Sequence, residues 1–269
     1  MQEKEPIIEI TDLVTFYGQR KVLDGINLEI MSGETMTILG RSGCGKSTLL
    51  RHLIGLSQPS SGKIYVKGQD VTNISEEDML PIRRKIGMLF QGSALFNSMT
   101  IGDNVALPLR EHTHLEEPTI KIMTRMKLDQ VGLAGFEDFM PAQLSGGMKK
   151  RAALARAIAM DPDILFCDEP SAGLDPIVAV GIDHLILKLK KAFRMTIVVV
   201  THELASVFII ADRVALLDNG KIIALGTVDE LKKSNDSKVQ QFFNRIPDPE
   251  DIDREKYLNS LIGEGIESE

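Results

Sequence analysis

A glycine-rich segment of nine residues ends in a lysine followed by two hydroxyl side chains. The segment consists of Gly40, Arg41, Ser42, Gly43, Cys44, Gly45, Lys46, Ser47 and Thr48. Glycines at this spacing let the backbone curl so that successive N–H groups point inward and can hold phosphate oxygens. Lys46 would neutralise β- and γ-phosphate charge, and the Ser47 hydroxyl would ligate Mg²⁺. The pattern predicts a phosphate-binding P-loop between a strand and a helix; the alternative is a glycine-rich turn with a chance lysine.

Two carboxylates follow an apolar run later in the chain. Asp168 and Glu169 end the sequence ILFCDE at residues 164–169. We expect Asp168 to reach Mg²⁺ directly or through water, and Glu169 to orient and deprotonate an attacking water. The alternative is a pair of strand-end carboxylates facing solvent. The P-loop in the same chain favours the catalytic interpretation, because ligands bind at the carboxyl ends of parallel strands.

Three further side chains stand where predicted strands end. His202 follows the run IVVVT, and its imidazole could donate to a γ-phosphate oxygen or hold the water, although a lone histidine is more often structural. Gln91 ends the run IGMLFQ; it is either a surface polar residue or a sensor of the γ-phosphate beside Mg²⁺. Tyr17 is either an ordinary strand-end aromatic or a stacking platform for adenine.

A second glycine-rich segment precedes a basic helix. Ser145, Gly146 and Gly147 stand at the predicted helix start, where backbone N–H groups and the serine hydroxyl would form another anion site. The alternative is a flexible turn. One chain already has a complete phosphate cradle at residues 40–48, so a second one makes sense if it closes over the nucleotide of another subunit.

Apolar patterns predict the elements that position these groups. The runs at residues 164–169 and 195–203 do not alternate, which is typical of central parallel strands covered on both faces. Residues 7–14 and 22–30 alternate as half-buried strands do. From about residue 97 to 160 the pattern is mostly helical.

We therefore expect an α/β fold: a mostly parallel P-loop sheet with an antiparallel β lobe and a helical lobe at about residues 92–150. A hairpin should turn at Asn219-Gly220, and one helix should run over residues 227–244. The expected organisation is a nucleotide-binding domain over residues 1–244 and an acidic tail over residues 245–269.

Composition narrows the class of protein. The net charge of −7 argues against a nucleic-acid binder, which normally needs basic patches. No apolar run approaches the roughly 18–20 residues that cross a bilayer, and the first ten residues lack a secretory signal. Cys44 and Cys167 do not make a disulfide framework, which favours a reducing, cytosolic setting.

The tail is the most unevenly charged segment. Residues 245–269 hold three positive and eight negative side chains. Leu258, Leu261 and Ile262 have the spacing of one helical face. We expect this face to dock on a second copy of the chain or on a small partner subunit.

Six features of the sequence occur in the order that ATP-binding-cassette (ABC) ATPases show: the P-loop, Gln91, LSGGM, ILFCDEP, SAGLDP and His202. The chain resembles that family over residues 7–226. The resemblance implies a head-to-tail dimer that holds two ATP molecules with Mg²⁺ between P-loop and signature segment. It also implies roles for individual residues: Glu169 the catalytic carboxylate, Asp168 and Gln91 on Mg²⁺, His202 the switch histidine, Tyr17 on adenine and Asp175 bridging the dimer. The signature segment departs from the family at Met148, where glutamine is usual.

A narrower resemblance rests on residues 144–163 and 104–115, LSGGMKKRAALARAIAMDPD and NVALPLREHTHL. These segments are similar to the ATPase subunit of MCE-type phospholipid transporters, the Mla system. The resemblance implies an integral membrane permease, an MCE-domain protein and, in some lineages, a small STAS-domain subunit as partners. It also implies a peripheral place at the cytoplasmic face of the inner membrane. The groove for the permease is expected around Phe90–Pro108.

Three alternatives remain open at this point. The first is a transporter ATPase for another substrate, such as amino acids or lipoproteins. The second is a soluble cassette protein acting on ribosomes or DNA, which the single cassette and the acidic charge disfavour. The third is a nucleotide-binding regulator that does not hydrolyse ATP, which Glu169 and His202 disfavour.

Cys44 lies in the P-loop beside Lys46. Its electropositive surroundings predict a thiolate that alkylating reagents modify and MgATP protects. The alternative is an unreactive small residue that fills space.

Overall fold

The computed structural model describes residues 5–246 of the chain. These residues belong to two compact units, one up to Lys233 and one from Ser234 onward. The strands are β1 (Pro6–Tyr17), β2 (Arg20–Met31), β3 (Thr35–Gly40), β4 (Ser61–Val66), β5 (Gln69–Asp70), β6 (Ile86–Leu89), β7 (Ile164–Asp168), β8 (Thr196–Thr201), β9 (Arg213–Asp218) and β10 (Lys221–Gly226). The helices are α1 (Lys46–Leu53), α2 (Glu76–Arg83), α3 (Ile101–His112), α4 (Glu117–Gln130), α5 (Gly146–Ala157), α6 (Pro176–Phe193), α7 (Leu204–Ile210), α8 (Val228–Lys232) and α9 (Ser237–Phe243), with a 3₁₀ turn at Pro141–Gln143.

The larger sheet has the strand order β10-β9-β3-β8-β7-β6 within the described residues. Its neighbouring strands are parallel except for β10, which pairs antiparallel with β9. The two continuous apolar runs form β7 and β8, and every residue of β8 is buried. The prediction of central parallel strands is therefore confirmed.

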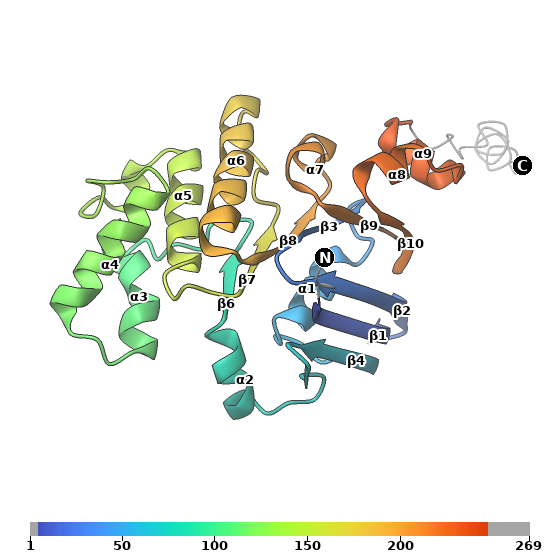
Figure 1. The fold of residues 1–269 in the computed structure, drawn as a ribbon, viewed down its shortest axis with the longest axis horizontal. Coiled ribbons are helices and arrows are strands. Elements are labelled where there is room, and N and C mark those ends of the chain that lie inside the picture. Colours follow the sequence, from blue (N-terminus) through green and yellow to red (C-terminus); the bar gives the residue numbers. More distant parts are fainter. Residues whose placement is uncertain (1–4, 247–269) are drawn as a thin grey trace, which may run out of the picture. The chain divides into compact units, whose positions relative to one another are not determined.

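Strand β7 shows why these runs do not alternate. Leu165 and Cys167 pack into one apolar cluster with residues of α5 and α6, whereas Ile164 and Phe166 pack into a second cluster with residues of α1. Figure 1 shows the helical lobe on one side of β6 and β7 and the β1–β2–β4 sheet on the other side of the first unit. Both faces of the strand are covered, so each of these positions must be apolar.

The smaller sheet is antiparallel, with the order β2-β1-β4-β5 in the described part of the chain. Ile8, Ile10 and Ile64 face the second cluster, and the residues between them are more exposed. This is the alternation of a half-buried strand. The predicted antiparallel lobe is confirmed, and its β4–β5 hairpin turns at Gly68.

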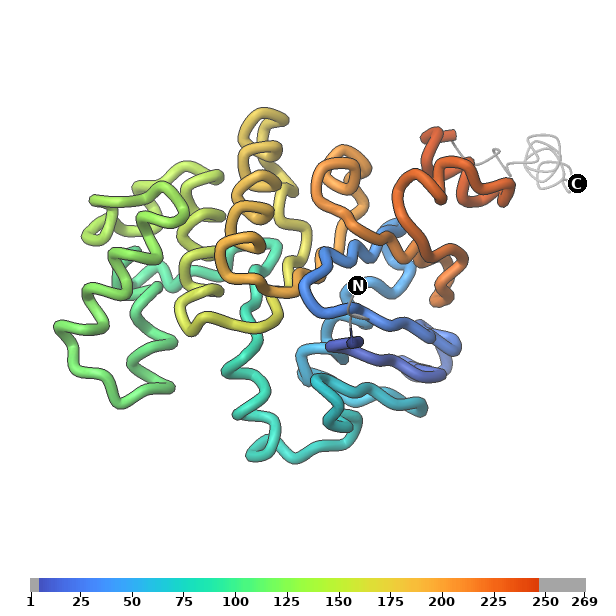
Figure 2. The backbone as a smooth tube through the Cα atoms, in the orientation of Figure 1, coloured from blue at the N-terminus to red at the C-terminus, as the bar shows by residue number. Residues whose placement is uncertain are grey.

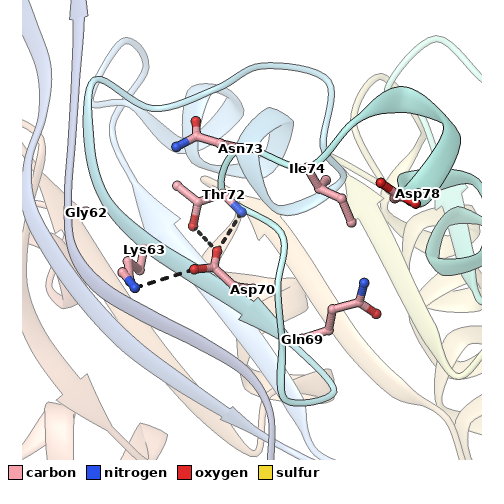
Figure 3. Close-up of a pocket in the computed structure, with 8 residues that line it drawn as sticks. All are labelled: Gly62, Lys63, Gln69, Asp70, Thr72, Asn73, Ile74 and Asp78. Carbon is pink, nitrogen blue, oxygen red and sulfur yellow. Dashed lines mark hydrogen bonds and ion pairs between the residues drawn. The ribbon is translucent and has the colours of Figure 1, made fainter.

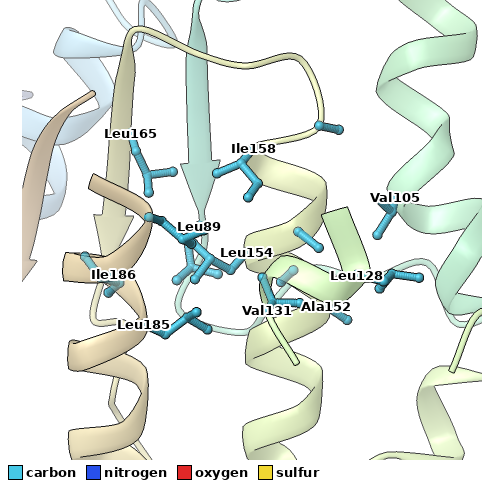
Figure 4. Packing of buried hydrophobic residues seen from close by; sticks show 14 of the residues in the cluster. Leu89, Val105, Leu128, Val131, Ala152, Leu154, Ile158, Leu165, Leu185 and Ile186 are labelled. Atoms are coloured by element: carbon cyan, nitrogen blue, oxygen red, sulfur yellow. The ribbon is translucent and has the colours of Figure 1, made fainter. Parts of the chain in front are cut away.

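The helical lobe consists mainly of α3, α4 and the start of α5, and it lies where the sequence predicts it. Figure 2 follows the chain from β6 out through α3 and α4 and back along α5 to β7. Leu154 of α5 packs in the same cluster as Leu89 of β6 and Leu165 of β7 (Figure 4). Helix α5 is therefore anchored by apolar contacts to the two strands that precede Gln91 and Glu169.

The predicted turn at Asn219-Gly220 is confirmed, and the prediction of a single helix over residues 227–244 is wrong. Asn219 and Gly220 take positive φ values of 45° and 76°, as a two-residue hairpin turn between twisted strands requires. Thr227 and Glu230 form a capping box, but the helix that they open ends at Lys232. A new helix, α9, begins because the Asp236 side chain accepts from the N–H groups of Lys238 and Val239.

Residues 227–244 thus form two helices in place of the single predicted one. The compact units divide at Lys233, whereas the sequence predicts a domain that extends to residue 244. The proposed apolar face at Leu258, Leu261 and Ile262 lies outside the described residues. No helix within residues 5–246 is long and apolar enough to span a bilayer.

Candidate functional site

The glycine-rich segment 40–48 runs from the end of β3 into α1, as predicted. Gly43 and Gly45 have positive φ values of 77° and 112°, which a side chain would strain. The Lys46 ammonium is buried and donates to the carbonyl oxygens of Gly40 (2.8 Å) and Arg41 (2.9 Å). The lysine therefore lies within the loop, where its charge adds to the attraction that the backbone N–H groups exert on an anion.

The hairpin between β9 and β10 supports this loop from behind. The Gly220 N–H donates to the Cys44 carbonyl at 3.1 Å, and the Asp24 N–H donates to the Gly220 carbonyl at 2.9 Å. A Cβ atom on Gly220 would come within 2.5 Å of the Val22 carbonyl oxygen. The P-loop, β2 and the hairpin turn are therefore packed backbone against backbone.

An open pocket of about 520 Å³ brings most of the predicted site residues together. It is lined by Tyr17, Arg20, Val22, Ser42, Gly43, Gly45, Lys46, Ser47, Thr48, Gln91, Asp168, Glu169 and His202. The sequence analysis does not single out Arg20 and Val22, although both follow Tyr17 closely in sequence. Gly40, Arg41 and Cys44 belong to the same loop but do not line this pocket.

Glu169 is held in an unusual backbone conformation. Its φ is 47°, in the left-handed region that disfavours residues with a Cβ, and its N–H still donates to the Val200 carbonyl at 2.8 Å. The turn brings its carboxylate to Thr201, whose hydroxyl donates at 3.0 Å, and to His202, whose Nδ1 lies 2.7 Å away. Two side-chain contacts therefore orient a buried carboxylate that lines the pocket, a geometry suited to a general base.

The surroundings of the Asp168 carboxyl group favour the binding of a cation. Burial raises the pKa of its carboxyl, and the neighbouring Glu169 charge raises it further, while Lys46 and Lys150 oppose the shift. A cation beside Asp168 would favour the ionised form. The Asp168 carboxylate, the Ser47 hydroxyl and Gln91 line one pocket and offer the oxygen ligands that Mg²⁺ prefers. Among residues 5–246, no cluster of three His, Cys, Asp or Glu side chains could hold a metal by itself, so the remaining ligands would have to come from phosphate or water.

Ser145, Gly146 and Gly147 do not line this pocket. They start α5, where the Ser145 hydroxyl accepts from the Met148 N–H at 3.3 Å, and Ser145 and Gly146 are exposed. Asp175 caps the neighbouring helix α6 by accepting from the Val178 N–H at 3.1 Å. The predicted helix start is therefore confirmed as a feature of the fold, separate from the lining of the chain's own P-loop pocket.

Gly147 has a packing role that the sequence does not reveal. It is buried, and an added Cβ would come within 2.5 Å of Val178 Cγ1 in the first turn of α6. We expect Gly147→Ala to lower the free energy of unfolding by about 1–3 kcal/mol, because valine is too stiff to move aside. Urea unfolding followed by circular dichroism measures this, and Val178→Ala in the same chain should restore most of the loss.

Gly146→Ala is the matched control, since its added Cβ would meet only Leu174 Cδ2 at 3.4 Å. Equal destabilisation by the two alanines would contradict the packing explanation.

Cys44 does not meet the expectation of a reactive thiol. Burial raises its pKa and outweighs the nearby Lys46 charge, which acts in the opposite direction. The side chain is only 7% exposed. The prediction of a thiolate is therefore wrong, and Cys44 fills space behind the loop.

A buried polar cluster that the sequence does not predict lies behind the site. The hydroxyl groups of Ser171, which follows Glu169 closely, and Ser206 of α7 are 3.0 Å apart. Asp183 of α6 bonds to Ser206, but its Oδ1 has no hydrogen-bond partner and the residue is 1% exposed. Burial raises the pKa of this carboxyl above its ordinary 3.8.

Because its pKa is raised, Asp183 makes the folded chain less stable as pH rises. In the unfolded chain Asp183 ionises near 3.8, whereas the fold favours its protonated form. The free energy of unfolding therefore falls as pH rises from that value through the raised pKa. An asparagine at this position cannot ionise, so we expect Asp183→Asn to raise Tm by about 2–4 °C at pH 8 and by less at pH 4.

Calorimetry at both pH values measures this shift. Asp129→Asn, at an exposed position of α4, is the control and should leave Tm unchanged at either pH. A Tm gain for Asp183→Asn that is the same at both pH values would contradict the assignment.

Other hollows in the described part of the chain lie apart from this pocket, and two of them bear on function. The hollow in Figure 3 has a volume of about 410 Å³. Its Asp70 carboxylate already accepts hydrogen bonds from Thr72 and forms an ion pair with Lys63, so these two charges are paired with each other. A groove of about 420 Å³ lies where the sequence predicts one. Phe90, Phe96 and Pro108 line it together with Arg83, Arg84, His112 and Arg156.

The fold and this site define a P-loop nucleotide-binding protein. The family model for ABC transporters matches residues 23–172, more than half of the chain. The chain belongs to the ABC transporter family, and as a cassette of that family it binds and hydrolyses ATP.

Curated relatives match over most of the chain. The intermembrane phospholipid transport system ATP-binding protein MlaF of Haemophilus influenzae is 44% identical over 88% of this chain and 89% of its own length. MlaF of Escherichia coli K12 is 42% identical over 90% of both chains. A probable ribonucleotide transport ATP-binding protein, mkl, of Mycobacterium leprae is 40% identical over 88% of this chain and 68% of its own.

A solved structure supports the fold. The ATP-binding cassette MJ0796, in a dimeric post-hydrolysis state bound to ADP and Pi, has a TM-score of 0.75 and 31% identity. The match covers 82% of this chain and 98% of the MJ0796 chain. The expected fold class, a P-loop sheet with an antiparallel lobe and a helical lobe, is confirmed.

Proposed function

We propose that this chain is the ATP-hydrolysing motor subunit of a membrane transporter that moves phospholipid. The observation that carries the proposal is the pocket in which Lys46, Asp168, Glu169 and His202 meet. The phospholipid assignment rests on the two MlaF relatives, which are phospholipid transport proteins by name.

The site residues divide into those that bind and those that react. The N–H groups of residues 40–48 and the Lys46 ammonium would hold the phosphates, and Tyr17, 50% exposed at the pocket's edge, would stack on adenine. Ser47, Asp168 and Gln91 would hold Mg²⁺, which supplies charge neutralisation at the β- and γ-phosphates. Glu169 would take a proton from the attacking water, while His202 would orient that carboxylate and contact the γ-phosphate.

A second copy of the chain would complete each site head to tail. The N-terminus of α5, where Ser145 and Gly146 are exposed and the buried Gly147 follows, offers a phosphate site that the chain's own pocket does not include. Beside it, Asp175 caps α6 and the Ile177 side chain is 85% exposed, so it is available for contact with a second copy. The dimeric state of MJ0796 supports this arrangement.

The groove at Phe90, Phe96 and Pro108 would receive an integral membrane permease. It combines exposed aromatic side chains, at 38% for Phe90 and 50% for Phe96, with arginines on its rim. Such a surface fits an amphipathic segment with an acidic side chain. The other partners of the proposal are an MCE-domain protein and a small STAS-type subunit, at the cytoplasmic face of the inner membrane.

The test is ATP-dependent transport by the chain reconstituted in vesicles with a candidate integral membrane permease. Labelled phosphatidylethanolamine or phosphatidylglycerol should move between vesicles only when MgATP is present. A labelled ribonucleotide and a labelled amino acid serve as competing cargoes, because mkl is named for ribonucleotide transport. Movement of either solute without lipid movement would overturn the phospholipid assignment and leave the motor function standing.

A further inference from the structure

Two cationic side chains of α5 hold the backbone that follows β6. The Lys150 ammonium donates to the Gln91 carbonyl at 2.5 Å. Arg156, further along the same helix, donates to the carbonyls of Ser93 at 3.0 Å and Ala94 at 2.7 Å. Charge-assisted bonds of this kind are stronger than neutral ones, so α5 determines where residues 91–94 lie.

The backbone conformation that these bonds hold is unfavourable by itself. Ser93 and Ala94 have φ values of 65° and 51°, in the left-handed region, although neither is glycine. Such conformations persist where surrounding contacts enforce them. The bonds from Arg156 are contacts of that kind, and they act on the chain immediately after Gln91.

Lys150 also reaches the second catalytic strand. Its ammonium lies 3.3 Å from the carbonyl oxygen of Glu169, the residue with the left-handed φ of 47°. The side chain is only 4% exposed, and burial lowers the pKa of its ammonium. A buried cation is costly unless it is bonded, and these two carbonyls are the bonds that the structure provides.

We propose that Lys150 is a positioning residue for ATP hydrolysis, which from α5 holds the backbone carbonyls of Gln91 and Glu169 and thereby orients both side chains toward the P-loop pocket. The inference rests on the proposed roles of Gln91 and Glu169. Because α5 begins at Ser145 and Gly146, a shift of that N-terminus would move Gln91 and Glu169 of the same chain. Contact between the start of α5 and the ATP bound to another copy would then change the positions of this copy's own catalytic groups.

The variants to compare are Lys150→Met, Lys150→Arg and Lys149→Met in the full-length chain. Methionine keeps the apolar stem and removes the donor, arginine keeps a buried cation, and Lys149 is a half-buried neighbour on the same helix. We expect Lys150→Met to lower kcat by up to about 10²-fold, the cost of misplacing a reacting group by about 1 Å, with KM for ATP little changed. Lys150→Arg should recover most of kcat, and Lys149→Met should match the unchanged chain.

A double-mutant cycle separates positioning from a general structural effect. Because Lys150 would act in part through Glu169, Lys150→Met should cause a smaller loss of turnover in the Glu169→Gln background than in the unchanged chain. Losses that multiply in the double variant would overturn the inference, and so would a Lys150→Met kcat equal to that of Lys149→Met. Normal turnover by Glu169→Gln alone would instead overturn the proposed role of Glu169.

Loss of folding should not hide these outcomes, because Leu154 and its neighbours already anchor α5 in the apolar cluster. Thermal unfolding of each variant checks this. Should Lys150→Met unfold below the assay temperature, the same cycle is run with Lys150→Gln, which is shorter and cannot bond both carbonyls. The same pattern of losses is then expected, and multiplying losses again overturn the inference.

Discussion

Glu169→Gln lowers ATP turnover by about 10²–10⁴-fold, the contribution that a positioned general base makes to a rate. Glutamine has nearly the same shape as glutamate and can still accept from the Thr201 hydroxyl and contact His202 Nδ1. It cannot take a proton from water. The P-loop and Lys46 are unchanged, so ATP binding should persist while hydrolysis stops.

Two measurements check this result: phosphate release under MgATP excess, and equilibrium binding of a fluorescent ATP analogue. Glu203→Gln removes a neighbouring carboxylate, which lies 3.4 Å from His202 Nε2, and serves as the control for lost negative charge. Its effect on turnover should be far smaller. If Glu169→Gln releases phosphate at the unchanged rate, Glu169 is not the base.

Lys46→Ala should fail at the earlier step of nucleotide binding. Hydrogen bonds to a charged group contribute about 1.5–3 kcal/mol, so the loss of this ammonium should weaken ATP binding by roughly 10–100-fold. Turnover at moderate ATP concentration should fall at least as far. Calorimetric titration of the chain with MgATP measures the affinity directly.

Lys46 also bonds two carbonyls of its own loop, so the variant could change the loop itself. Thermal unfolding of the nucleotide-free variant tests for that change. Lys63→Ala, in the separate hollow on the β lobe, removes an exposed lysine as the control. Unchanged ATP affinity in Lys46→Ala would contradict the assignment of the P-loop.

The features that the sequence predicts well are local ones. The phosphate loop depends on glycines within nine residues, and the two-residue turn depends on Asn219-Gly220 alone. The buried strands depend on continuous apolar runs whose two faces meet different clusters. Because strand ends and loop ends carry the reacting groups, the pocket residues Asp168, Glu169 and His202 follow from the same local patterns.

The features that the sequence does not predict depend on contacts between distant segments. Nothing near Lys150 indicates that it reaches Gln91, and Gly147 looks like an anion-binding glycine until Val178 packs on it. The Cys44 prediction is wrong because it weighs a neighbouring charge and cannot weigh burial. The break after α8 is different: the residues at 234–236, Ser-Asn-Asp, are a turn signal that the prediction of one helix neglects.

The hairpin turn behind the phosphate loop has a consequence for protein engineering. The tips of surface hairpins are ordinarily good places for inserted tags or new chain termini, because little depends on their backbone. Gly220 is buried, and its N–H and carbonyl join Cys44 and Asp24. A peptide inserted at Asn219-Gly220 would therefore disturb the nucleotide site from its far side. A fluorescent or affinity label on this chain belongs elsewhere, for example at the exposed residues 114–116 that connect α3 and α4.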